Sequence, residues 1–158
     1  MPRSRGTALV DTPSGILVTL EGGVSDLFLP GGGVEQGESE LEGAIRELRE
    51  ETGLEAVLAV PLFRFQSTIN RHFVCYIRAT GQPTLGHGVK YLGYYRDGQL
   101  FPIAWQPGFE SLPADRLSHS TQAIIKLYQL YRQECKAWFE ALDRQLELEE
   151  YTHADVKG

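Results

Sequence analysis

The chain is poor in cysteine and has no surplus of positive charge. Its two cysteines, Cys75 and Cys135, are far apart in sequence and form no metal-type pair. Both lie in apolar runs, so we expect two buried free thiols. A formal net charge of -6 argues against a general nucleic-acid or membrane-surface binder. An apolar stretch of about 18 residues and a signal peptide are both missing, which favours a reducing cytoplasm.

The remaining composition is that of an ordinary folded domain. Hydrophobic residues make up 42% of the chain and charged residues 23%, which does not favour disorder. A length of 158 residues is enough to bury one core. We expect a single domain over residues 1–158, with a core of about 5–130 and a helical extension of about 131–150.

Three glutamates are spaced to share one face of a helix. Glu47, Glu50 and Glu51 stand at relative positions i, i+3 and i+4, which are neighbours on a helix surface. Three anions so close repel each other, by about 0.2–0.5 kcal/mol per exposed pair. A cluster of carboxylate oxygens suits a hard divalent cation such as Mg²⁺ or Mn²⁺. The spacing alone also fits a solvated acidic surface.

An apolar stripe predicts that this segment is a helix packed on a sheet. Leu41, Ala44, Ile45 and Leu48 recur at helical spacing, and Gly53 stands where a helix would end. Apolar, often β-branched runs on either side predict strands at residues 7–10, 15–20, 57–68, 72–79 and 89–95. We expect a hairpin between the first two strands, a loose start over residues 1–6, and loops at residues 31–33 and 102–117.

The C-terminal part has a wide aromatic stripe of helical period from Ser118 to about Glu149. A single helix of that length would measure about 45 Å, more than a small domain needs. Two alternatives follow: the helix is broken in two, or its distal half packs on a second copy as a homodimer. Residues from about Tyr151 onward are expected to fray.

The segment from Gly32 to Leu54 resembles the Nudix box, the signature of the Nudix hydrolase family. Every fixed position of that pattern is filled here, by Gly32, Glu38, Arg46, Glu47, Leu48, Glu50, Glu51, Gly53 and Leu54. The resemblance implies an α/β fold: a Nudix-type α/β/α sandwich with a mixed β-sheet, here followed by a long C-terminal helix.

The resemblance also implies roles for the box residues. The metal ligands for Mg²⁺ or Mn²⁺ would be the carbonyl of Gly31 and the carboxylates of Glu47, Glu50 and Glu51. The catalytic residues would be Glu47, Glu50 and Arg46, with one of the two glutamates as the general base. Glu38 and Gly32 would support the loop and the carboxylates.

The sequence indicates less clearly which residue is the general base and which residues bind the substrate. Some family members take the base from a loop well after the box, but residues 81–91 contain no Asp or Glu. His87 is the one group in that loop that titrates near neutral pH, so it is a candidate for catalysis or for substrate binding. Arg64, Arg71 and Arg78 are candidates for phosphate binding, although plain surface polarity would also explain them.

The resemblance therefore predicts a divalent-metal-dependent pyrophosphohydrolase, which splits a phosphoanhydride bond in a nucleoside diphosphate linked to another group. Its partner would be a nucleotide-like small molecule, with no nucleic-acid polymer and no membrane. The alternative is a Nudix-fold module that senses a ligand or binds a protein, with weak or no catalysis. An intact set of box carboxylates favours the enzyme.

Overall fold

The computed structural model describes residues 3–145. These residues fall into two compact units, one ending at Gln122 and the other starting at Ala123. The first unit contains two four-stranded sheets and one long helix, and it carries all the residues of the box. No helix within the described range is both long enough and apolar enough to span a membrane.

The first sheet is mixed and forms the platform for the box helix. Its strand order is β4-β1-β6-β5. The bounds are β4 Gly31–Gly33, β1 Arg3–Leu9, β6 Asn70–Thr80 and β5 Glu55–Gln66. Strands β1 and β6 run parallel, and the other two pairs are antiparallel. The α/β class with a mixed sheet is therefore confirmed.

The second sheet is antiparallel throughout. Its order is β2-β3-β7-β8, with bounds β2 Asp11–Thr12, β3 Gly15–Glu21, β7 Val89–Arg96 and β8 Gln99–Trp105. A short 3₁₀ turn, Ala114–Arg116, follows β8.

The predicted hairpin between the first two strands is wrong. The chain does turn at residues 11–15, but that turn joins only β2 to β3. Strand β1 lies in the other sheet because it pairs along its whole length with β6, from Arg3 opposite Asn70 to Leu9 opposite Tyr76. The expected loose start is also wrong for residues 3–6, since β1 begins at Arg3, and residues 1–2 lie outside the described range.

Two segments that we expected to be loops are strands. The three glycines Gly31–Gly33 form β4, which pairs with Arg5–Thr7 of β1. Strand β8 occupies residues 99–105, part of which looked like proline-punctuated loop. Pro102 is tolerated there because β8 is an edge strand and its register shifts near Gly93.

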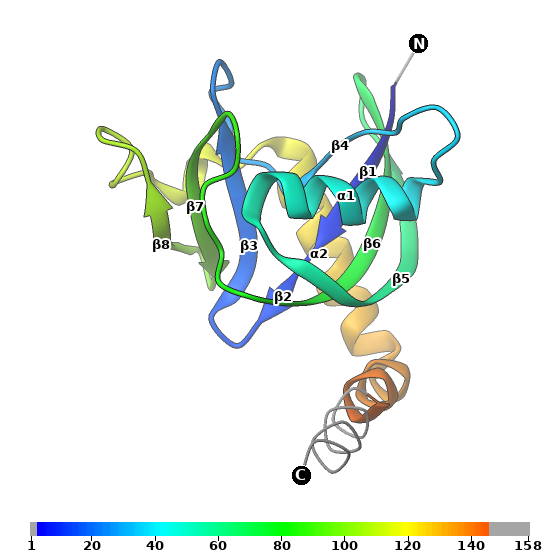
Figure 1. Cartoon of the computed structure of the whole chain (residues 1–158). Helices are drawn as coiled ribbons and strands as arrows, with labels where there is room; N and C mark the ends of the chain where they lie inside the picture. Colours follow the sequence, from blue (N-terminus) through cyan, green and yellow to red (C-terminus); the bar gives the residue numbers. More distant parts are fainter. Residues whose placement is uncertain (1–2, 146–158) are drawn as a thin grey trace, which may run out of the picture. The chain divides into compact units, whose positions relative to one another are not determined.

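Helix α1, Glu40–Thr52, covers one face of the first sheet (Figure 1). Its apolar stripe is buried as predicted: Ala44 and Leu48 are fully buried, and Leu41 and Ile45 pack beside them. They join a core cluster with β1 and β6 residues such as Ala8, Cys75 and Ile77. The opposite flank of the helix is thereby left for polar side chains.

The C-terminal helical pattern is broken in two, one of the two expected alternatives. Helix α2 spans His119–Glu134, Cys135 forms a turn, and residues 136–145 are helical again. Within the second unit, the Phe139 ring packs edge-on against Tyr128 and Trp138. The expectation of two buried thiols holds for Cys75 but not for Cys135, because the turn at the helix break leaves Cys135 exposed. The predicted helix beyond residue 145 lies outside the described residues.

Candidate active site

Both ends of α1 are fixed by local sequence. Ser39 is the N-cap, and its hydroxyl accepts from the backbone N–H of Glu42 at 3.1 Å, while the Glu42 carboxylate accepts from the Ser39 N–H at 3.1 Å. At the other end Gly53 has a φ of 76° and donates its N–H to the Arg49 carbonyl at 2.8 Å. The box glutamates therefore sit on a helix whose ends are well defined.

Strand β4 brings backbone against the carboxylates because its glycines have no side chains. Gly31 has a φ of 154°, and a Cβ there would meet the Gly6 carbonyl oxygen. A Cβ on Gly32 would lie 2.6 Å from both Cδ and Oε1 of Glu47. Close approach of β4 to β1 and to the Glu47 carboxylate thus requires glycine at both positions.

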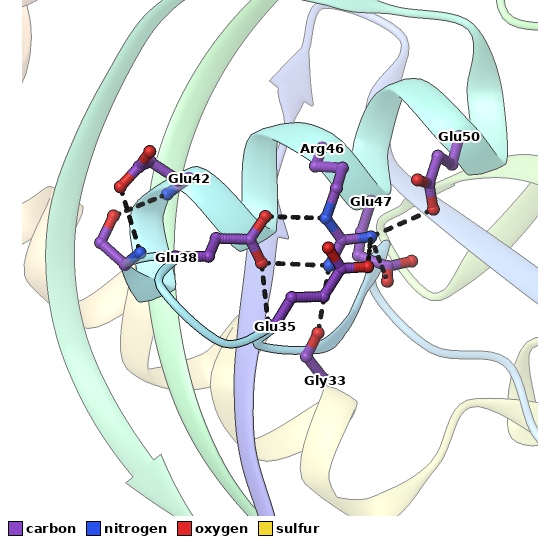
Figure 2. A network of polar contacts seen from close by, with 8 residues as sticks. Gly33, Glu35, Glu38, Glu42, Arg46, Glu47 and Glu50 are labelled. Carbon is purple, nitrogen blue, oxygen red and sulfur yellow. Dashed lines mark hydrogen bonds and ion pairs between the residues drawn. The ribbon is translucent and has the colours of Figure 1, made fainter.

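Arg46 is the centre of the polar network on α1 (Figure 2). Its side chain is only 16% exposed. Nε and Nη2 donate to the two oxygens of Glu38 at 2.8 and 3.1 Å, in the two-pronged geometry that guanidinium and carboxylate groups favour. Nη1 donates to Glu47 at 3.0 Å and to Glu50 at 3.1 Å, and Nη2 also donates to the Gly33 carbonyl at 3.1 Å. Arg46 thus ties the loop after β4 to two of the three box carboxylates.

This network favours the charged forms of Arg46 and Glu38. The hydrogen bonds from Arg46 are the main reason why the pKa of Glu38 lies below its usual value, and the Glu35 N–H, at 3.0 Å, adds to the effect. In return, the bond to Glu38 is the main reason why the pKa of Arg46 is raised. These bonds would let Glu38 hold Arg46 in place, and its supporting role stays a prediction.

Glu51 is in a different environment from its two neighbours. Its side chain is buried, with the residue only 5% exposed, and the Gly31 N–H points at its two oxygens from 3.3 and 3.4 Å. Burial, and after it the negative charge of Glu21, raise its pKa to about 9, although Arg5 opposes the shift. Burial and nearby negative charge therefore disfavour the charged form of this carboxyl, a cost that a bound cation would offset.

Arg5 and Glu21 both influence the pKa of Glu51, although no sequence pattern indicated that they belong to the site. Arg5 lies in β1, donates to the Leu29 carbonyl at 3.0 Å, and stands 5.7 Å from the centre of the Phe28 ring. Burial lowers its pKa, and the charge of Glu51 is the largest influence in the opposite direction. Arg5 is placed there by the pairing of β1 with both β4 and β6, and neither pairing has a local sequence signal.

The donor chemistry fits a hard divalent cation. Glu47 and Glu51 lie close to the glycine strand β4, and Arg46 joins Glu50 to Glu47. Carboxylate and carbonyl oxygens of this kind are the ligands that such cations prefer. Among residues 3–145, however, no three acidic, histidine or cysteine side chains are already arranged around one metal position. Binding would therefore require Glu47 and Glu50 to exchange contacts with Arg46 for contacts with the ion.

The loop without acidic residues lies against the same helix end. The Gly86 N–H donates to the Glu51 carbonyl at 2.9 Å, and Thr84 N–H to the Thr52 carbonyl at 2.8 Å. Gly86 is packed so tightly that a Cβ would meet the Glu50 carbonyl. His87, which follows Gly86, is exposed beside the box.

The three candidate arginines do not all lie at one site. Arg64 and Arg71 line one pocket of about 570 Å³ with Glu40, near the start of α1. Arg78 is elsewhere: its Nη1 donates to the Asp11 carbonyl at 3.3 Å and its guanidinium lies 5.4 Å from the Tyr76 ring centre.

Comparisons with known proteins agree with this fold. A family model described as NUDIX domain matches residues 2–97. Among solved structures, a protein classed in the Nudix hydrolase family from Chromobacterium violaceum is 31% identical, with a TM-score of 0.70 over 96% of this chain and 92% of that one. A UDP-X diphosphatase is 25% identical, with a TM-score of 0.55 over 85% of this chain and 64% of that one.

A MutT Nudix hydrolase from Burkholderia pseudomallei shares the fold at 21% identity, with a TM-score of 0.59 over 80% of this chain and 97% of that one. No curated protein sequence matches the chain significantly. The extent of the family match, together with the similarity to the Chromobacterium protein over nearly the whole length, decides the assignment: the chain belongs to the Nudix hydrolase family.

Proposed function

We propose that the chain hydrolyses a phosphoanhydride bond in a nucleoside diphosphate linked to another group, with Mg²⁺ or Mn²⁺ as cofactor. The observation that supports this most is the closeness of Glu47 and Glu51 to the glycine strand β4, with Glu50 joined to Glu47 through Arg46. The similarity to a UDP-X diphosphatase is in keeping with a nucleotide-linked substrate.

The protein would hold the cation with the carboxylates of Glu47, Glu50 and Glu51 and the carbonyl of Gly31. A divalent cation at such a site offsets phosphate charge and lowers the pKa of a bound water. Arg46 and Glu38 would keep the loop after β4 in register with the helix, and Gly32 would leave room for the Glu47 carboxylate.

Either Glu50 or Glu47 would take the proton from the attacking water. The Glu50 side chain is 57% exposed and that of Glu47 is 19% exposed, so Glu50 is the freer to reach a water molecule. Glu51 is a poorer candidate because its carboxylate is buried and points at β4. His87 remains the alternative base, since it lies in the loop attached to the end of α1.

A ligand-sensing module is the second candidate function. Two observations favour it: residues 81–91 contain no acid that could act as base, and Arg46 already occupies Glu47 and Glu50. A sensor would bind a nucleotide-like ligand without turning it over.

The test is a turnover screen in Mg²⁺ or Mn²⁺ over nucleoside triphosphates, nucleotide sugars, dinucleoside polyphosphates and inositol pyrophosphates. Release of phosphate, pyrophosphate or a mononucleotide is measured for the wild type and for Glu47→Gln and Glu50→Gln. Glu55→Gln is the matched control, because Glu55 is an exposed glutamate outside the network of Arg46.

We expect turnover of a nucleoside diphosphate derivative that the control retains and that at least one box variant loses by about 10²–10⁴-fold. Near wild-type turnover in both box variants would contradict the role of a box glutamate as base. Tight binding of one compound with no turnover of any would favour the sensor.

A further inference from the structure

A second pocket lies at the start of α1, away from the three box carboxylates. Its volume is about 570 Å³, within the range of small-molecule sites. Its lining includes Ser4, Glu40, Arg64, Gln66, Arg71 and Phe73. We name it the Arg64–Arg71 pocket. Since α1 rises about 1.5 Å per residue, Glu40 lies roughly 10–16 Å along the helix from the box glutamates.

Strand register places the polar side chains of this pocket on the face that α1 covers. Gly6 of β1 lies beneath the helix, because a Cβ there would stand 2.6 Å from the Ala44 nitrogen. Ser4 is two residues from Gly6 and so shares its face. Arg71 is the β6 partner of Ser4, and Gln66 is the β5 partner of Arg71.

The second arginine reaches the same face through Phe73. Phe73 is the β6 partner of Gly6, and Arg64 is the β5 partner of Phe73. The Arg64 guanidinium lies 5.3 Å from the centre of the Phe73 ring, which holds it at the pocket wall. Arg71 Nη2 lies 3.4 Å from the Ser4 hydroxyl oxygen. Both guanidinium groups are thus positioned by neighbours that carry no charge.

These two arginines lack the anionic partners that other arginines of the chain have. Arg46, Arg49 and Arg132 each form ion pairs with acidic side chains. Within residues 3–145, no carboxylate oxygen lies within 4.0 Å of a guanidinium nitrogen of Arg64 or Arg71. Two uncompensated guanidinium groups facing one pocket, in a chain of net charge -6, indicate an anionic ligand.

The rest of the lining narrows the class of ligand. Glu40 offers carboxylate oxygens that accept hydrogen bonds, and Gln66 and Ser4 offer neutral donors and acceptors. A bare anion would be repelled by Glu40, whereas a phosphate attached to a polyol would give Glu40 a hydroxyl donor. We propose that the Arg64–Arg71 pocket binds a phosphorylated sugar or nucleotide, with the phosphate on the two arginines and a sugar hydroxyl on Glu40.

The test is calorimetric titration of ribose 5-phosphate into the full chain, in EDTA so that no divalent cation can recruit phosphate to the box. We expect saturable binding by the wild type and a Kd about 10- to 100-fold higher in the double variant Arg64→Gln, Arg71→Gln. Arg96→Gln is the matched control, because Arg96 also lies over a phenylalanine, 4.9 Å from the Phe101 ring centre, but in the other sheet. Its Kd should equal that of the wild type.

Two results would overturn the proposal: no saturation of the wild type up to about 10 mM ligand, or the same Kd in the wild type and the double variant. If the double variant does not fold, amide chemical shifts of the wild type decide instead. Ribose 5-phosphate should shift amides of residues 64–66 and 71–73, and shifts confined to other regions would contradict the site. Glu40→Gln should weaken binding of ribose 5-phosphate but not of inorganic phosphate; equal or stronger binding of both would refute the hydroxyl contact.

The phosphorylated sugar could be a separate molecule or the far end of the hydrolysed substrate. The kcat and KM of the double variant on the best substrate distinguish a separate molecule from the far end of the substrate. A raised KM at unchanged kcat would place the substrate's own phosphate in the pocket. Unchanged kinetics together with weaker binding of ribose 5-phosphate would indicate a separate ligand. This comparison uses the proposed hydrolysis, whereas the titration in EDTA stands without it.

Discussion

The three consecutive glycines of β4 should respond differently to the same substitution, although they are neighbours in one short strand. A Cβ on Gly31 would meet the backbone carbonyl of Gly6, whereas a Cβ on Gly32 would meet the carboxylate of Glu47. On Gly33 it would meet no atom within 4 Å. Alanine at Gly31 therefore tests backbone packing, and alanine at Gly32 tests the placement of the carboxylate. Alanine at Gly33 tests neither and is the control.

Gly31→Ala should destabilise the fold. Its φ of 154° disfavours a side chain, and the Gly6 carbonyl belongs to a paired strand that cannot move easily. Strain and overpacking each cost about 1–3 kcal/mol, so we expect a loss of about 2–4 kcal/mol in the free energy of unfolding. Urea denaturation measures it.

Gly32→Ala should leave stability within about 1 kcal/mol of the wild type and still lower turnover, because the obstructed group is the end of a flexible side chain. The Glu47 carboxylate would have to retreat from 2.6 Å to an ordinary contact of 3.4 Å, a shift of 3.4 − 2.6 = 0.8 Å. Misplacement by about 1 Å costs about 10²-fold in rate. We expect kcat/KM to fall by 10- to 100-fold on the substrate found in the screen.

Gly33→Ala is the control, with near wild-type stability and turnover. Our account of β4 would be refuted if Gly32→Ala kept full activity, or if the three variants lost stability to the same extent. The first result would mean that the closeness of Glu47 to Gly32 does not matter for the reaction, and the second that the three positions do not differ in packing as described.

Three further substitutions test the surroundings of the site. Arg46→Met should lower the free energy of unfolding by about 2 kcal/mol, measured by urea denaturation, because it removes charge-assisted bonds to Glu38 and Glu47; no change would show that the network is dispensable. Ser39→Ala should cost about 1 kcal/mol through loss of the N-cap, and a neutral result would contradict the capping box. His72 is 3% exposed and burial lowers its pKa to about 4, so the unfolded chain binds its proton first as pH falls below 6.5. Stability should therefore drop between pH 6.5 and 4 by about 2–3 kcal/mol more in the wild type than in His72→Asn, and parallel pH profiles would contradict this.

Local patterns in the sequence predicted the box helix well. Spacing of apolar residues gave the buried stripe of α1, and Gly53 marked its end. These features depend on contacts within a few residues, which a single sequence displays directly. The grouping of Glu47 and Glu50 around Arg46 follows from the same local geometry.

Sheet pairing could not be predicted in the same way. Strand β1 pairs with β6, more than 60 residues later in the chain. The residues of neither strand indicate which strand is its pairing partner. Arg71 comes to lie beside Ser4 through that pairing, and Arg5 is placed at the site by β1 pairing with both β6 and β4. The strand at Gly31–Gly33 could not be predicted either, since glycine is depleted in strands and β4 forms by pairing with β1.

The Mg²⁺ dependence of turnover tests the central claim most directly. Initial rates on the best substrate are measured against Mg²⁺ concentration for the wild type, for Glu51→Gln, and for the exposed control Glu55→Gln. We predict no turnover without a divalent cation, saturation with Mg²⁺ for the wild type and the control, and at least about a 10²-fold loss in Glu51→Gln. Turnover that is independent of the cation, or a Glu51→Gln curve that overlays the wild type, would contradict a metal site on α1.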